Sequence, residues 1–177
     1  MNVEGLSRPR RLERSDIRTT FRSGVPELDT WLHRYAYQNQ SPDSAAAYVS
    51  CISSHVVGFY TIAAGAISRS RGTGSITDGQ VSEDYPCILL ARLAVDQRYV
   101  ARGIGSALLE DALRRALHVS ASLGATAVLV HAADAASRSF YQHQVDCFPS
   151  PVDDLQLVIP MSFIAQVYGS APVHVAS

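Results

Sequence analysis

Hydrophobic positions recur along the chain with two periods, and the changes between them predict the order of the elements. Positions 28, 31, 32 and 35 share one face of a helix that begins near Pro26. Two stretches rich in β-branched and aromatic residues follow, 46–53 and 55–68, and Ser53-Ser54 predicts a tight antiparallel turn between them. The polar, glycine-containing segment 69–86 is expected to form a loop.

The second half of the chain alternates between strands and helices. Residues 87–95 read as a buried strand, and a helix is predicted from about 103 to a stop at Gly124. A strand over 126–132 precedes a short helix with Asp134 as its N-cap, and 155–161 is the last strand. The fold class is therefore α/β: one domain over 1–163 with a mixed central sheet flanked by helices, and a loosely ordered tail from 162, with 164–177 outside the domain.

Composition agrees with one globular domain. The chain has 177 residues, of which 47% are hydrophobic and 18% charged. No apolar run is long enough to span a membrane, and the first residues lack the apolar core of a secretory signal. The three cysteines have no CxxC spacing and an odd count, which favours buried reduced thiols in a cytoplasmic protein, and no metal site is predicted.

Charge is distributed unevenly. All 15 basic residues are arginines, and the first 22 residues carry six of them against three acidic residues. Arginine binds phosphate through paired hydrogen bonds, so an RNA partner is one interpretation of this basic segment. A solvated arm without a ligand is the other.

The segment 98–117, "RYVARGIGSALLEDALRRAL", places two glycines where a strand leads into a helix. Free amide N–H groups and the positive end of the helix dipole make such a loop suitable for an anion. A Rossmann fingerprint is excluded because position 108 is leucine, and a Walker loop because the chain has no lysine. A helix cap without a ligand remains open at this point.

The longer run "ARLAVDQRYVARGIGSALL" resembles the pyrophosphate-binding motif of the GNAT N-acetyltransferases, Arg/Gln-x-x-Gly-x-Gly/Ala. Gly103 and Gly105 match, and Arg102 stands where arginine is common. Val100 departs from the expected Arg or Gln, and Ala101 replaces a frequent glycine. The resemblance implies that the loop binds the pyrophosphate of acetyl-CoA and that the preceding strand binds its pantetheine arm, with Arg98 or Arg102 compensating for Val100.

A second stretch, "HAADAASRSFYQHQ", resembles a later motif of the same family, a short helix that carries Phe-Tyr beneath the CoA thiol. The resemblance implies that Tyr141 is the catalytic acid that protonates the departing thiolate. The segment 145–148 departs from the family's pattern after this tyrosine. The cofactor-binding residues implied by the two motifs are Leu93, Ala94, Val95, Val100, Ala101, Arg102, Gly103, Ile104, Gly105, Ser106, Asp134 and Phe140.

Three further stretches, near the start, in the middle and near the end of 5–163, are similar to the acetyltransferase toxins of bacterial type II toxin–antitoxin modules. They are "FRSGVPELDTWLHRYAYQNQ", "VVGFYTIAAGAISR" and "PSPVDDLQLVIPM". This similarity implies acetylation of the α-amine of aminoacyl-tRNA, which blocks translation. It also implies a homodimer, a small ribbon-helix-helix antitoxin, and DNA binding only through that antitoxin.

An α-amine has a pKa near neutrality, so no strong base is required, and none stands beside the motif. Expelling the thiolate needs the acid Tyr141, and N–H groups near Leu93–Val95 are the expected oxyanion donors. His131 is a further candidate, although a structural histidine is the commoner case. The residues expected to bind tRNA are Arg92, Arg71, Arg10 and Arg11.

Two alternatives remain. The same fold can acetylate a small amine or a protein N-terminus, although the matches in the N-terminal helix and hairpin favour the tRNA substrate. The chain can also be a non-catalytic CoA-binding partner of an antitoxin repressor, which Val100 and the altered segment 145–148 leave open.

Overall fold

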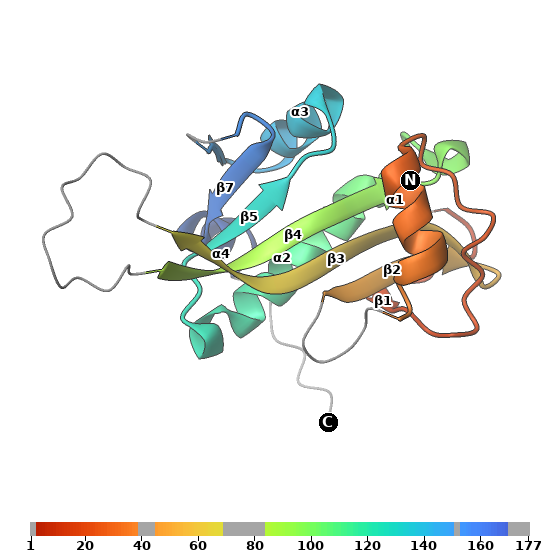
Figure 1. Cartoon of the computed structure of the whole chain (residues 1–177), viewed down its shortest axis with the longest axis horizontal. Coiled ribbons are helices and arrows are strands. Elements are labelled where there is room, and N and C mark those ends of the chain that lie inside the picture. The colour runs from red at the N-terminus through yellow and green to blue at the C-terminus, as the bar shows by residue number, and fades with distance from the viewer. Residues whose placement is uncertain (1–2, 39–44, 69–83, 151–152, 170–177) are drawn as a thin grey trace, which may run out of the picture.

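A computed structural model describes residues 3–38, 45–68, 84–150 and 153–169. Its centre is a seven-stranded sheet in the order β1-β2-β3-β4-β5-β7-β6, in which β4 and β5 are parallel and all other neighbours are antiparallel (Figure 1). The strands are β1 (Arg10–Arg11), β2 (Ala46–Ile52), β3 (His55–Ser68), β4 (Asp84–Val95), β5 (Ala127–His131), β6 (Phe148–Pro149) and β7 (Gln156–Pro160). The predicted α/β class and mixed sheet are confirmed.

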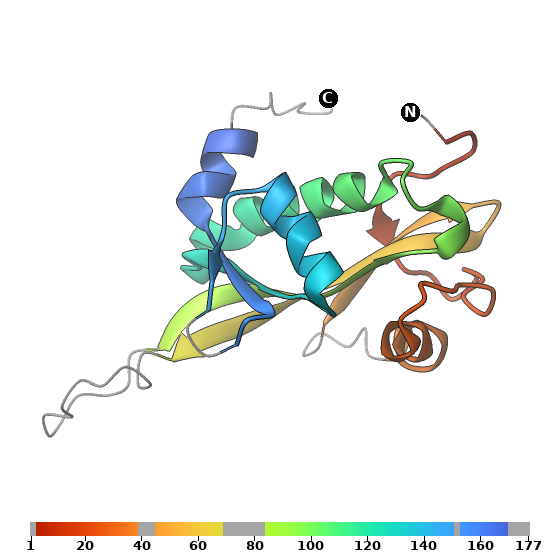
Figure 2. The same ribbon diagram turned by 90° about the horizontal axis from the view of Figure 1, so that it is seen from above.

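Helices cover both faces of the sheet (Figure 2). Helix α1 (Pro26–Thr30), which continues as a π-helical turn over Trp31–Tyr35, lies with the N-terminal segment on one face. Helices α2 (Ile104–Leu123), α3 (Ala135–Gln144) and α4 (Met161–Tyr168) lie on the other. None of the helices in the described residues is long and apolar enough to cross a membrane.

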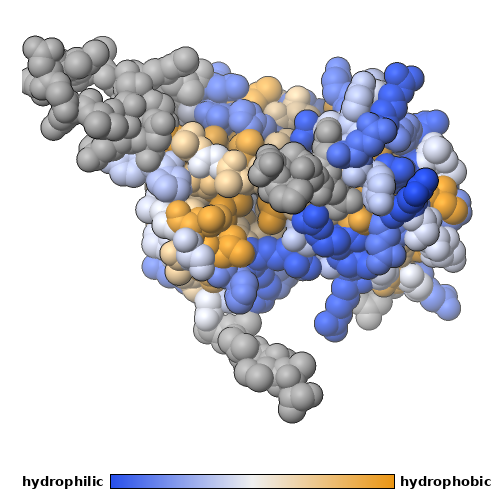
Figure 3. Space-filling model, turned by 60° about the horizontal axis from the view of Figure 1, so that its bottom comes forward, coloured by the Kyte–Doolittle hydropathy of each residue, from blue (hydrophilic) through white to orange (hydrophobic). Residues whose placement is uncertain are grey.

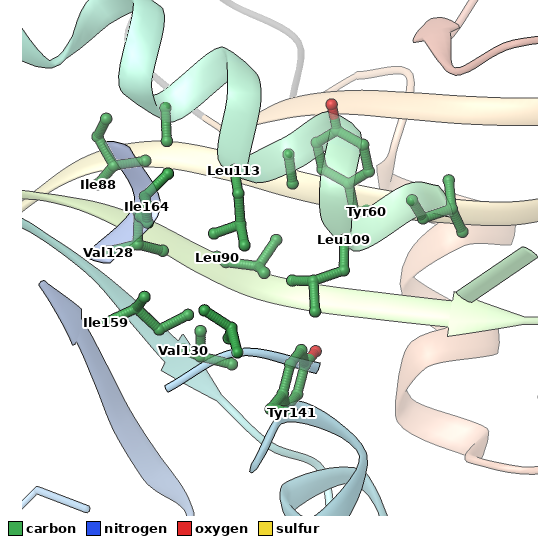
Figure 4. Close-up of a cluster of buried hydrophobic side chains, with 14 of the residues drawn as sticks. Tyr60, Ile88, Leu90, Leu109, Leu113, Val128, Val130, Tyr141, Ile159 and Ile164 are labelled. Carbon is green, nitrogen blue, oxygen red and sulfur yellow. The ribbon is translucent and has the colours of Figure 1, made fainter. Parts of the chain in front are cut away.

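The hydrophobic core is divided accordingly into two clusters. The larger one joins α2, α3 and α4 to the sheet and includes Tyr60, Leu90, Leu109 and Tyr141 (Figure 4). The smaller one packs the N-terminal segment and the π-helical turn onto β2 and β3 around Phe21, Leu32, Val49 and Phe59. Each face of the sheet thus carries one buried apolar cluster, as the alternating apolar pattern of the strands requires.

Helix α2 and the hairpin form as the sequence predicts. Ser53 and Ser54, both at positive φ, make the tight turn between β2 and β3. Gly124 caps α2 in the left-handed conformation at φ 64°. At Gly58 of β3 a Cβ would lie 2.8 Å from Leu108 Cδ1, so the missing side chain lets α2 approach the sheet.

A β-bulge divides β4 into two parts. Thr61 of β3 pairs with Arg92, but Ile62 pairs with Leu90, so Ala91 is the extra residue. Parallel pairing with β5 also ends at Leu90, opposite Val130. Beyond that point the edge of β4 that faces β5 has no partner strand among the described residues. The bulge therefore opens a gap in the centre of the sheet.

Several predictions about the termini of elements are wrong. The tail is helical from Met161 to Tyr168 instead of loosely ordered, because Ile164 is buried against the core that α2 forms, and α4 runs across residue 163. Strand β4 begins at Asp84, within the predicted loop 69–86, whose residues 69–83 lie outside the described part of the chain. The two-residue strands β1 and β6 were too short for a periodic signal.

Asp96 connects the end of β4 to the N-terminal segment. This buried carboxylate accepts hydrogen bonds from the amides of Arg22 (3.0 Å) and Arg98 (2.9 Å) and from the Arg98 guanidinium (3.0 and 3.1 Å). Burial opposes its ionisation, but these bonds outweigh burial and lower its pKa. The carboxylate therefore fixes the start of the loop that leads into α2.

We expect Asp96→Asn to destabilise the fold by about 2–3 kcal/mol at pH 7. The NH₂ group of the amide would face N–H donors of Arg22 or Arg98, which now donate to the carboxylate. Because the pKa of Asp96 is lower in the folded than in the unfolded protein, its ionised carboxylate stabilises the fold at pH values above the unfolded-state pKa, which is near 4. This stabilisation is lost as the pH falls through the folded-state pKa. The difference in Tm between the variant and the wild type should therefore shrink below about pH 4. The exposed Asp146→Asn is the control, and an equal loss in both variants would contradict this role.

Candidate active site

A cavity of about 250 Å³ lies where β4 and β5 part. Ala91, Arg92 and Leu93 of β4 form one wall, and the end of β5 with the following loop forms the next. Helices α1 and α3 close the remaining sides. The complete lining is Val25, Glu27, Leu28, Ala91, Arg92, Leu93, His131, Ala132, Ala133, Ser137 and Tyr141.

Tyr141 reaches this cavity from α3 and is only 3% exposed. It packs at the edge of the larger core with Leu109 and Val130 (Figure 4). Burial raises its pKa, so the phenol stays neutral and is a proton donor over the physiological range. The side chain predicted as the acid therefore lies beside the unpaired part of β4.

The position of α3 depends on Asp134 and Phe140. The Asp134 carboxylate accepts the amide hydrogen of Ser137 at 2.8 Å and caps the helix, as predicted from the sequence. Phe140 contacts Tyr141 edge to face, with ring centroids 5.4 Å apart. A Cβ built at Gly105 would lie 3.5 Å from Phe140 Cζ, an ordinary contact distance, so the Phe140 ring of α3 lies next to the first turn of α2.

The loop before α2 has the backbone conformation of an anion site. Ala101 and Gly103 adopt positive φ values of 60° and 82°, and no side chain caps the helix. The first amides of α2, at Ile104, Gly105 and Ser106, therefore lack helical acceptors and lie at the positive end of the dipole. Such concave loops bind phosphate groups.

Arg98 and Arg102 are the two arginines that could supply the anion contact that Val100 cannot make, and only Arg102 is free to do so. Arg98 is held by Asp96, whereas the Arg102 guanidinium lies 5.4 Å from the ring centroid of Tyr99 and makes no ion pair within the described residues. The Val100 side chain is 55% exposed. Arg102 is therefore the cation that the loop offers.

Arg92 is a half-buried cation inside the cavity. Its guanidinium carbon lies 4.2 Å above the ring centroid of Trp31, and burial lowers its pKa. It forms no ion pair with any residue that the structure describes. An unpaired, partly desolvated guanidinium beside the cavity attracts a phosphate or carboxylate.

Glu27 is the residue that sequence reasoning missed. The sequence predicts no base beside the motif, but α1 brings the exposed carboxylate of Glu27 to the cavity. His131 lines the cavity as well, and its Nε2 lies 3.3 Å from Gln156 Nε2. Only the packing of α1 over β4 reveals Glu27, since nothing in its local sequence distinguishes it.

The other predicted tRNA contacts are not gathered here. Arg10 makes a two-pronged ion pair with buried Asp16, with both contacts at 2.8 Å, and Arg11 lies over the ring of Tyr48. Both belong to β1, three strands away from β4. Arg71 lies outside the described residues.

Comparison with known proteins agrees with this geometry. Residues 13–145 match the acetyltransferase (GNAT) family. The chain belongs to this family. It is 39% identical over 159 residues to a tRNA-acetylating toxin of Mycobacterium tuberculosis, a match that covers 90% of this chain and 95% of the relative.

Two solved structures share the GNAT fold. One is a tyrosine-to-phenylalanine mutant of the AtaT toxin bound to the C-terminus of the antitoxin AtaR and acetyl-CoA (TM-score 0.79, 20% identity, covering 93% of this chain and 99% of that one). The other is AtaT complexed with acetyl-methionyl-tRNAfMet (TM-score 0.78, 20% identity, 92% and 99% coverage). At this identity they establish the fold of the chain.

The positive φ values of the GNAT loop predict opposite effects of two substitutions. Gly103→Ala has open space for a Cβ but a strained backbone, and should cost about 1–2 kcal/mol. Ala101→Gly relieves the same strain and should leave the free energy of unfolding unchanged or raise it by up to about 1 kcal/mol. Denaturant unfolding measures both, and equal destabilisation by the two changes would contradict this loop conformation.

Proposed function

We propose that this protein transfers the acetyl group of acetyl-CoA to the α-amine of an aminoacyl-tRNA and so removes that tRNA from translation. The observation that carries the proposal is that Tyr141, the part of β4 beyond its pairing with β5, and Arg92 line one and the same cavity, and that Arg92 has no ion pair within the described residues. The M. tuberculosis relative, a tRNA-acetylating toxin over nearly the same length, supports the same substrate. A small amine would not need the half-buried guanidinium.

Both parts of acetyl-CoA, the pyrophosphate and the pantetheine arm, have a place in this site. The pyrophosphate of acetyl-CoA binds the free amides of the loop, from Ala101 to Ser106, with Arg102 beside them. The pantetheine arm then runs along the edge of β4 that β5 leaves unpaired, at Leu93–Val95. Phe140 and Asp134 act through the placement of α3. No metal is required for this chemistry, which is an acyl transfer between sulfur and nitrogen.

The reaction proceeds by attack of the neutral α-amine on the thioester carbonyl carbon. The carbonyl oxygen gains negative charge, which N–H groups of Leu93–Val95 stabilise. When the tetrahedral intermediate collapses, the C–S bond breaks and the Tyr141 hydroxyl gives its proton to the sulfur. The amine releases its own proton, which restores the phenol directly or through water, and CoA leaves as the thiol.

Contacts with the body of the tRNA complete the proposal. Arg92 binds near the reacting end of the RNA, while Arg10, Arg11 and Arg71 are assigned to more distant phosphates. Figure 3 shows that the part of the surface on the side of the N-terminal segment is mostly hydrophilic, which suits such contacts. Because Arg10 is already paired with Asp16, we expect Arg11 to contribute more than Arg10.

The remaining assignments concern partners and location. We propose a homodimer in the cytoplasm, neutralised by a small ribbon-helix-helix antitoxin through which alone the complex binds DNA. The AtaT structure with the antitoxin C-terminus supports the antitoxin partner. The catalytic domain is assigned to 1–163, although α4 crosses that boundary.

Tyr141→Phe tests the function directly. The variant should lose about 10²–10⁴-fold in turnover with little change in acetyl-CoA affinity, because only the proton donor is removed. Purified protein, acetyl-CoA and a total pool of charged tRNA are incubated, and the digested RNA is searched for N-acetyl-aminoacyl adenosine by mass spectrometry. Product from wild type alone supports the proposal and identifies the amino acid. Bound acetyl-CoA with no RNA product from either protein would favour a small amine, a protein N-terminus or a non-catalytic role.

The value of kcat/KM should rise with pH and show no decline on the alkaline side of the range tested. The amine must be neutral, so kcat/KM rises through the pKa of the α-amine, at or below about 8. Tyr141 must stay protonated, and burial raises its pKa, so no decline is expected up to about pH 10. Initial rates across this range measure the profile. A bell with an alkaline limb below pH 9 would show that Tyr141 is not the acid.

A further inference from the structure

A second hollow adjoins the cavity on the outer side of α1. It has a volume of about 330 Å³ and is lined by Pro26, Glu27, Thr30, Trp31 and Tyr35. Glu27 lines both spaces, so its residue lies at the boundary between them. The cavity, which contains Tyr141, and the hollow, which extends to Tyr35 of the π-helical turn, are together called the groove.

The indole of Trp31 is held firmly in this groove. It lies parallel to the ring of Phe59, with 6.0 Å between centroids and 8° between planes, and Arg92 packs onto it from β4. Tyr35, one turn further along, is 47% exposed. Fixed aromatic rings backed by a cation are the means by which proteins stack unpaired nucleobases.

The order of groups along the groove matches the end of a charged tRNA. If the α-amine reaches Tyr141 in the inner cavity, its ester places the terminal ribose at the junction and the adenine in the outer hollow. The junction holds a carboxylate, Glu27, and carboxylates accept hydrogen bonds from ribose hydroxyls. An amino acid esterified at the 3′ position leaves the 2′-hydroxyl free for this contact.

We propose that the outer hollow is the subsite for the terminal adenosine of the acceptor strand. Trp31 and Tyr35 hold the base, and Glu27 accepts the hydrogen of the ribose 2′-hydroxyl. This inference rests on the proposed function. It makes Glu27 a specificity-determining residue, since the 2′-hydroxyl distinguishes RNA from DNA.

The test compares two short substrates that carry the same amino acid, an acetylable CCA trinucleotide ester and the same ester with a 2′-deoxy terminal adenosine. Wild type should show about tenfold lower kcat/KM with the deoxy substrate, the effect of one lost hydrogen bond to a charged group. Glu27→Gln should lower kcat/KM for the ribose substrate and discriminate much less between the two. An equal ribose preference in both proteins would overturn the role of Glu27.

The base contact is tested separately with Tyr35→Ala. Its KM for the ribose substrate should rise about tenfold with kcat little changed, whereas Tyr37→Ala, at a residue that is 41% exposed and lines neither hollow, should match wild type. Equal effects of the two changes would overturn the subsite. Unaltered acetyl-CoA binding and thermal unfolding confirm that each variant is folded. Failure of wild type to acetylate the ribose ester or charged tRNA would instead refute the proposed function.

Discussion

The separation of β4 from β5 beyond Leu90 is the constraint on which the rest of the site depends. Parallel strands in the middle of a sheet normally satisfy one another's backbone groups, and leaving them unpaired is costly unless a ligand or water replaces the partner. The bulge at Ala91 creates this condition and changes which side chains face α2: Ile88 and Leu90 before it, Leu93 and Val95 after it. The same irregularity thus frees the strand edge for the donor and places Arg92 on the face where α1 lies.

Several elements serve to hold the two sides of this gap at a fixed separation. On the donor side, Phe140 of α3 packs next to Gly105 in the first turn of α2, which helps to fix α3, and with it Tyr141, relative to the anion loop. On the acceptor side, Asp96 ties the end of β4 to Arg22 and hence to the segment that leads into α1. A change in either connection would alter the distance between the two substrates. The rate would then fall, because it depends strongly on how closely the reacting groups are held together.

The sequence predicted the features that depend on interactions between residues close together along the chain. The glycine loop, the cap at Asp134, the Ser53-Ser54 turn and the apolar stripe of α2 each follow from backbone geometry or period over a few residues. The order of the strands, the bulge at Ala91 and the presence of Glu27 and Tyr141 in one cavity depend on contacts between distant segments, which no periodicity encodes. Helix α4 was missed for a related reason: its burial against the α2 side of the core, not its flanking residues, makes it ordered.

The environment of Arg92 makes the cavity suited to a charged or polar ligand. Removing a guanidinium from water without a carboxylate partner is unfavourable, and a merely structural position would favour an aliphatic residue of similar size. The stack on Trp31 offsets only part of this, since a cation over an indole contributes about 0.5–2 kcal/mol. An anionic ligand that enters the cavity would recover the remainder, and the phosphates of the proposed tRNA substrate are such groups.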